Sequence, residues 1–265
     1  MNGKVPQNNL QPGDVLLYHG VGLISDLIRL FDGGPYSHAA VYDGANVLEA
    51  VAEGTVVDPV AQSVASAQFV DVYRFIANDG KPFGQPGCEA RPVLDRIQYY
   101  EQNRQRYGYE QLLLLALLCA TRHPQQGTLS PVEALILRRV LDQAAEVIAR
   151  LIHAGKEPMI CSELVYRCYT EAGAPYQIIV RGADIPVRAA AAAAQPRSTE
   201  DAAFQAEAAR FLLNYAVAKG HNVGGPKFLA ARAPHEIVTA AALADFVTPR
   251  DLETSPNLQK VGTLR

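Results

Sequence analysis

The sequence predicts an α+β fold in which an antiparallel sheet packs on a helix that begins at Cys161. Strand patterns dominate residues 14–75, and helical patterns dominate from about residue 91. Runs of strands followed by runs of helices are typical of α+β folds rather than of alternating βα units. With 265 residues, 49% of them hydrophobic, the chain can bury a sizeable core. We expect one domain over residues 1–265 that carries a helical insertion.

The first predicted elements are a strand and a short helix. Residues 14–19 follow the Pro12-Gly13 turn and read as a strand. An amphipathic helix should come next and end at Gly33-Gly34, because four apolar residues recur at helical spacing: Ile24, Leu27, Ile28 and Phe31.

A hairpin and a further strand complete the strand-rich part. Residues 38–42 and 45–51 read as two strands around Asp43-Gly44, which is a strong short-range hairpin signal. Residues 69–75 read as another strand.

The helical part begins with a segment over residues 90–157, which we interpret as a helical insertion or lid. Its predicted helices cover 91–104, 109–120 and a third stretch after the Ser130 cap. A short helix over 161–172 should end at Gly173. Residues 186–222 are predicted to form an alanine-rich linker and a helix. Residues 246–252, together with 255–256, are predicted to form a turn and a short packing segment.

Charge and hydropathy exclude two classes of function. The net charge of −3 and the absence of a basic run longer than Arg138-Arg139 argue against nucleic-acid binding. The longest strongly apolar run, residues 112–120, has about half the length of a membrane-spanning helix. Residues 1–12 are polar and unlike a secretory signal, so we expect synthesis in the cytoplasm, with export by a specialised route left open.

The four cysteines point to single-residue roles. Cys88, Cys119, Cys161 and Cys168 form no CxxC unit, so we expect no structural zinc, and no other metal or cofactor. Cys119 and Cys168 lie on apolar stretches and are predicted core residues, whereas Cys88 lies in a loop and is predicted to be exposed.

Hairpin geometry links His38 with Glu49. A two-residue turn at Asp43-Gly44 would place His38 directly opposite Glu49, with Cβ atoms roughly 5 Å apart. A four-residue turn would set Glu49 opposite Ala40, diagonal to His38 and still within reach. A three-residue turn would break this register. In the first two cases a carboxylate can hold the imidazole and raise its basicity.

Cys161 is predicted to lie at a helix start. There the helix dipole and the free N–H groups favour a thiolate, and His38 as an imidazolium would favour it further. The same N–H groups can bind an oxyanion. A cysteine with a distant histidine is the minimum equipment of a thiol nucleophile and its base.

Four blocks of the sequence resemble a known family: residues 13–17, 37–42, 47–50 and 161–166. Together they are similar to the circularly permuted branch of the NlpC-type papain-like hydrolases, and within it to the YiiX/YaeF group. The histidine block precedes the cysteine block, as in that branch. Residues 247–252 resemble the end of that group. One departure is Tyr109-Glu110, where these enzymes often carry Tyr-Asp.

The resemblance implies a permuted papain-like fold and a catalytic triad. Cys161 would be the nucleophile, His38 the base and Glu49 the residue that orients it. Tyr18 corresponds to an aromatic near the site of the family and, with Ser162, is assigned to substrate binding. His19 points to the opposite face of its strand, so at most one of Tyr18 and His19 can line the cleft.

Three functional hypotheses follow. The first is a thiol hydrolase that cleaves an amide or ester acyl bond in a peptide, a cell-wall peptide or another acylated substrate through a thioester. The second is a phospholipase or lipid acyltransferase with transient membrane contact, because related permuted enzymes act on lipids and Leu112–Leu118 would suit acyl chains. Family behaviour would then add export as an antibacterial effector. The third, disfavoured by the intact Cys–His–Glu set, is a binding module without catalysis.

Overall fold

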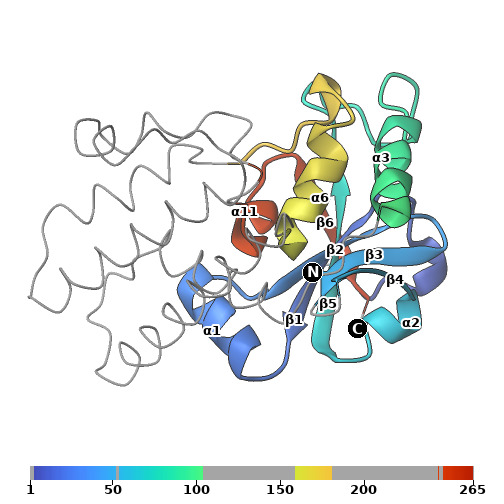
Figure 1. Ribbon diagram of the computed structural model, residues 1–265. Helices are drawn as coiled ribbons and strands as arrows, with labels where there is room; N and C mark the ends of the chain where they lie inside the picture. The colour runs from blue at the N-terminus through green and yellow to red at the C-terminus, as the bar shows by residue number, and fades with distance from the viewer. Residues whose placement is uncertain (1–2, 52–53, 104–158, 181–243, 245–246, 265) are drawn as a thin grey trace, which may run out of the picture.

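The protein combines one antiparallel sheet with a few helices, which is compatible with the α+β prediction (Figure 1). The computed structural model describes residues 3–51, 54–103, 159–180, 244 and 247–264. The sheet has six strands in the order β4-β3-β2-β1-β5-β6, and every neighbouring pair is antiparallel. In chain order the elements are η1 (Gln7–Asn9), β1 (Val15–Gly20), α1 (Leu23–Asp32), β2 (His38–Tyr42), β3 (Asn46–Val51), β4 (Gly54–Pro59), α2 (Val60–Ser63), β5 (Ala67–Phe75), α3 (Arg91–Gln102), α6 (Cys161–Thr170), η2 (Ala174–Tyr176), α11 (Pro249–Glu253) and β6 (Leu258–Thr263).

The predicted elements that fall on described residues are present with small shifts of their ends. The β1 strand matches the prediction for 14–19, and α1 ends at Gly33, whose φ of 66° is the left-handed conformation that glycine adopts readily. The α3 and α6 helices match the helices predicted over 91–104 and 161–172.

Two strands, β4 and β6, were not predicted, and both lie at the edges of the sheet. β4 is short and ends at Pro59, whose missing N–H is tolerated on an edge strand. β6 follows α11 in the tail, where we expected only a turn and a packing segment; it pairs with β5 through Lys260 and Leu258, opposite Tyr73 and Phe75. The predicted helices over 109–120 and after Ser130, the segment 186–222 and Cys119 lie outside the described residues.

The two faces of the sheet are covered by different elements. One face packs against α6 and α3 in a cluster that includes Val41, Leu48, Leu164 and Val165. The other face packs against α2 and the N-terminal segment in a second cluster: Val5, Leu10, Leu16, Tyr18, Ala40, Val47, Val60, Val64, Ala67, Val70 and Val72. Each fully buried aliphatic chain in these clusters stabilises the fold by about 1.5–3 kcal/mol.

Within the described ranges, every helix falls short of the length or the apolarity that crossing a bilayer requires.

Candidate active site

The hairpin that carries His38 and Glu49 closes with four residues, not two. Tyr42 pairs with Val47, so residues 43–46 lie between the last paired residues, although Asn46 already belongs to β3, and Glu49 lies opposite Ala40. The reason lies in Asp43, whose carboxylate accepts hydrogen bonds from the backbone N–H groups of Ala45 and Asn46. This side chain-to-backbone pattern draws both residues into the turn. The two-residue turn was therefore wrong, and the diagonal alternative is observed.

The diagonal arrangement keeps His38 and Glu49 in contact. Nε2 of His38 lies 2.7 Å from Oε2 of Glu49, and the Glu49 side chain is only 6% exposed. A hydrogen bond between an ionised carboxylate and an imidazole is stronger than a hydrogen bond between two neutral groups. Because Nε2 is engaged with Glu49, the second ring nitrogen, Nδ1, is left for another partner.

Cys161 is the first residue of α6, as the sequence predicts, and is a free cysteine that is 3% exposed. The preceding residue, Ile160, is extended, and its backbone N–H donates to the Glu163 carboxylate at 3.3 Å. Glu163 is in turn paired with Arg167 at 2.7 Å on the next turn of the helix. The helix start is therefore fixed by side chains other than the thiol.

Cys161 and His38 interact although they come from opposite sides of the sheet. Cys161 belongs to the cluster formed with α6, whereas the alternation along β2 directs His38 to the other face, with Ala40. His38 is the first residue of β2 and Cys161 is the first residue of α6, which packs against β2 and β3. A hydrogen bond with Cys161 is one of the causes that shift the pKa of His38.

The electrostatics keep a proton on His38. Burial alone would lower the pKa of this imidazole, but the charge interaction and hydrogen bond with Cys161, followed by those with Glu49, outweigh it and raise the pKa to about 10. At neutral pH the imidazole is then protonated. The arrangement is that of an imidazole held between a thiol and a carboxylate.

Tyr18 lies beside His38 but does not direct its hydroxyl toward open solvent. The two residues are opposite each other on β1 and β2, and their rings meet edge-on with centroids 5.1 Å apart. Tyr18 is 3% exposed, and its hydroxyl lies 2.6 Å from that of Ser63 in α2. Sequence reasoning missed Ser63, since nothing local in the sequence marks it and it lies 45 residues from its partner. Substrate binding by Tyr18 stays a prediction.

Ser162 is buried, and its hydroxyl donates to the backbone carbonyl of Val247 at 2.6 Å. The bond ties the start of α6 to the segment before α11. Because this hydroxyl is already bound, Ser162 could contact a substrate only through its backbone. Its assignment to substrate binding also stays a prediction.

His19 occupies the opposite face of β1, as the alternation predicts, and stacks on Phe69 with centroids 4.6 Å apart. It has no contact with His38 that would join it to the Cys–His–Glu set.

The prediction of an exposed thiol at Cys88 is wrong. Cys88 is fully buried because the loop before it folds back, with Gly84 donating to the Cys88 carbonyl at 2.8 Å. Burial raises the pKa of Cys88 and, more strongly, that of Cys168, which lies in the core as expected. A raised pKa leaves both thiols protonated and poorly reactive.

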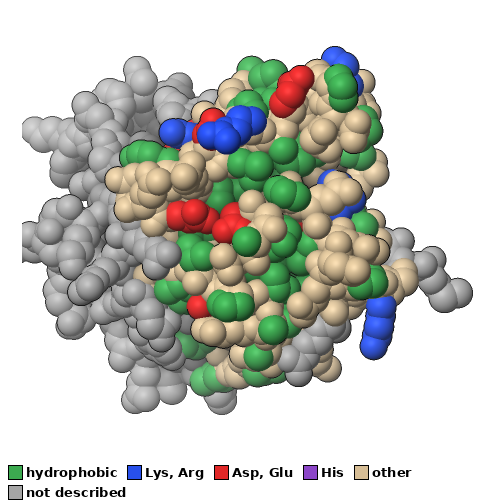
Figure 2. Space-filling model, turned by 90° about the vertical axis from the view of Figure 1, so that its right-hand side faces the viewer, with side chains coloured by type: hydrophobic (Ala, Val, Ile, Leu, Met, Phe, Trp, Pro, Cys, Tyr) green, Lys and Arg blue, Asp and Glu red, His purple; other side chains and the backbone are tan. Residues whose placement is uncertain are grey.

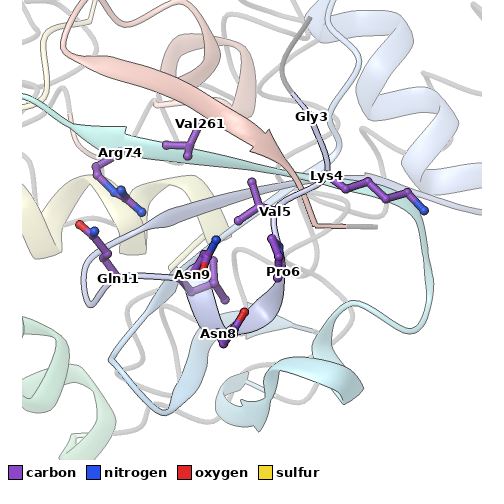
Figure 3. A pocket seen from close by; sticks show the side chains of 10 residues that line it. Gly3, Lys4, Val5, Pro6, Asn8, Asn9, Gln11, Arg74 and Val261 are labelled. Carbon is purple, nitrogen blue, oxygen red and sulfur yellow. The ribbon is translucent and has the colours of Figure 1, made fainter.

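A cavity of about 500 Å³ lies away from these residues, between the N-terminal segment and the β5–β6 edge of the sheet (Figure 3). Asn8, Asn9, Gln11 and Arg74 line it, and Arg74 is already bound to Asp14 by two hydrogen bonds of 2.7 Å. None of the residues predicted for the site is among those that line it.

On the face shown in Figure 2, Lys and Arg side chains stand at separate places, and hydrophobic and acidic side chains lie between them. This face therefore carries no continuous basic patch. Among the described residues, no three His, Cys, Asp or Glu side chains are grouped so that they could hold a metal ion.

A scan of the sequence against protein-family models found no match, and a search of curated proteins found no similar sequence. The geometry of Cys161, His38 and Glu49 is therefore the observation that points to a function.

Proposed function

We propose that the protein is a thiol hydrolase that cleaves an amide or ester acyl bond through a thioester on Cys161. The observation that carries the proposal is the interaction of one partly exposed imidazole with both a carboxylate, 2.7 Å away, and the thiol at the start of α6. A nucleophile, its base and a residue that orients the base are the parts that this chemistry needs.

The proposed reaction uses these groups in turn. The Cys161 thiolate attacks the substrate carbonyl carbon, and the imidazolium of His38 gives its proton to the departing amine or alcohol. Water then attacks the thioester while His38 takes up a proton, which releases the carboxylic acid and restores the thiolate–imidazolium pair. Glu49 holds the imidazole throughout, by accepting a hydrogen bond at Nε2.

The start of α6 supports the charge that develops in this reaction. The first N–H groups of a helix have no partner within the helix, and the helix dipole favours negative charge there. These groups stand where an oxyanion would form next to the Cys161 sulfur. Ile160 differs, because its N–H is bound by Glu163.

The order of the elements is the further support for a permuted papain-like fold. The strand that carries His38 precedes the helix that carries Cys161, and this helix packs on an antiparallel sheet. We propose on this ground, together with the resembling sequence blocks, that the protein is a permuted NlpC-type hydrolase of the YiiX/YaeF-like group.

Substrate assays with a matched variant test the proposal. Purified protein and its Cys161→Ala variant are each given phospholipid vesicles and peptidoglycan fragments or peptides. The proposal expects acyl-bond cleavage of one substrate class that disappears in the variant. Cleavage of the peptides identifies an amide hydrolase, and acyl-chain release from vesicles identifies the lipid alternative, for which the described residues offer no separate support. Equal activity of the variant would overturn the proposal.

A further inference from the structure

Tyr18 contributes a buried ring and a buried hydroxyl next to the candidate base. The ring stands at 62° to the imidazole of His38, with the centroids 5.1 Å apart, which is an edge-to-face contact. Tyr18, His38 and Glu49 lie on the same face of three neighbouring strands, so the imidazole is flanked by β1 on one side and β3 on the other.

The hydroxyl of Tyr18 is held by α2. Ser63, the last residue of that helix, is 8% exposed and lies 2.6 Å from the Tyr18 oxygen. Burial, with a smaller effect of the nearby Glu49 charge, raises the pKa of Tyr18 well above its ordinary range. The phenol therefore keeps its proton and takes part in a neutral hydrogen bond with the serine.

We propose that Tyr18 is a positioning residue that fixes the imidazole plane of His38, and that Ser63 fixes Tyr18. This inference rests on the proposed function, because it assigns a role within the same site. An imidazole serves the reaction only if one nitrogen meets Glu49 while the other faces Cys161, and a rotated ring would lose one of these contacts. The Tyr18 ring lies on the β1 side of the imidazole, where it limits rotation of the His38 ring.

A purely structural role for Tyr18 makes a different prediction. Tyr18 belongs to the second hydrophobic cluster, with Leu16, Ala40 and Val70, so its loss would lower stability in either case. Only the positioning role would also change how the His38–Cys161 pair responds to pH. The deciding measurement is therefore the pH profile of Cys161 alkylation by iodoacetamide, read by peptide mass spectrometry.

The experiment uses four single variants. Tyr18→Leu removes the ring, Tyr18→Phe and Ser63→Ala remove the hydroxyl contact, and Tyr42→Phe is the matched control. Tyr42 lies on the same face, and its hydroxyl donates to the Gly44 carbonyl at 2.8 Å within the hairpin turn. We expect Tyr18→Leu to slow alkylation at pH 6 about tenfold and each hydroxyl variant about threefold, from the usual strength of aromatic pairs and buried hydrogen bonds.

The outcomes separate this inference from the proposed function. If wild-type Cys161 reacts no faster than a free thiol at pH 6, the proposed function fails. If the wild-type protein reacts fast and the Tyr18 and Ser63 variants keep its profile, only the positioning role is overturned. A double variant Tyr18→Phe with Ser63→Ala should be no slower than either single variant, since one bond is lost in all three. Should Tyr18→Leu fail to fold, the two hydroxyl variants, which keep the packing, decide the question.

Discussion

Replacing Glu49 with glutamine should lower the pKa of His38 while leaving the fold intact. The substitution keeps the shape of the side chain but removes the charge that lies 2.7 Å from Nε2 in a nearly buried site. A hydrogen bond to a charged group is worth about 1.5–3 kcal/mol, and 1.36 kcal/mol corresponds to one pKa unit. We therefore expect the pKa of His38 to fall by about 1.5 units from its raised value of about 10.

The assay is an NMR titration of the His38 ring, assigned by comparison with a His38→Gln variant. Asp58→Asn is the matched control, because Asp58 lies on the neighbouring strand β4 and binds Gln62 instead of the imidazole. The control should titrate like the wild type. If His38 titrates unchanged in Glu49→Gln, the carboxylate contributes nothing to the proton on the imidazole, and its assigned role is wrong.

Three further predictions follow from the same contacts. Because the pKa of His38 is raised on folding, its contribution to stability is complete below about pH 6.5 and is lost as pH rises toward 10. Urea unfolding of the wild-type protein should show this loss. An equal pH dependence of stability in His38→Gln would contradict it. Asp43→Ala removes the carboxylate that binds two turn N–H groups and should lower the free energy of unfolding by about 1 kcal/mol; unchanged denaturation would argue against the turn mechanism. Ser162→Ala leaves the Val247 carbonyl without its donor and should cost about 1–3 kcal/mol; calorimetry that detects no shift would show that the bond does not anchor α6.

Local patterns in the sequence predict where His38, Glu49 and Cys161 lie in the fold, because the position of each is locally encoded. The period of two along β2 and β3 places His38 and Glu49 on one face whether the turn has two or four residues. The start of α6 at Cys161 follows from the extended residue before it and the apolar spacing after it.

Other features depend on contacts that local patterns do not encode. The turn length depended on whether the Asp43 carboxylate binds the turn, which the Asp-Gly pair alone does not determine. The edge strands β4 and β6 are defined by their partners, and Cys88 is buried by a loop that carries no apolar period. Ser63 comes next to the Tyr18 hydroxyl only when α2 packs over β1, and a local sequence pattern does not encode such a tertiary contact.

We propose that His38 keeps Cys161 as a reactive thiolate, and the alkylation rate of Cys161 at pH 6 tests this directly. A free thiol with its ordinary pKa of about 8.5 is less than about 1% ionised at this pH. We predict that wild-type Cys161 reacts with iodoacetamide at least about tenfold faster than a free thiol, and that His38→Gln loses this advantage. A wild-type rate no higher than that of the free thiol, or a rate that survives the loss of His38, would contradict the account.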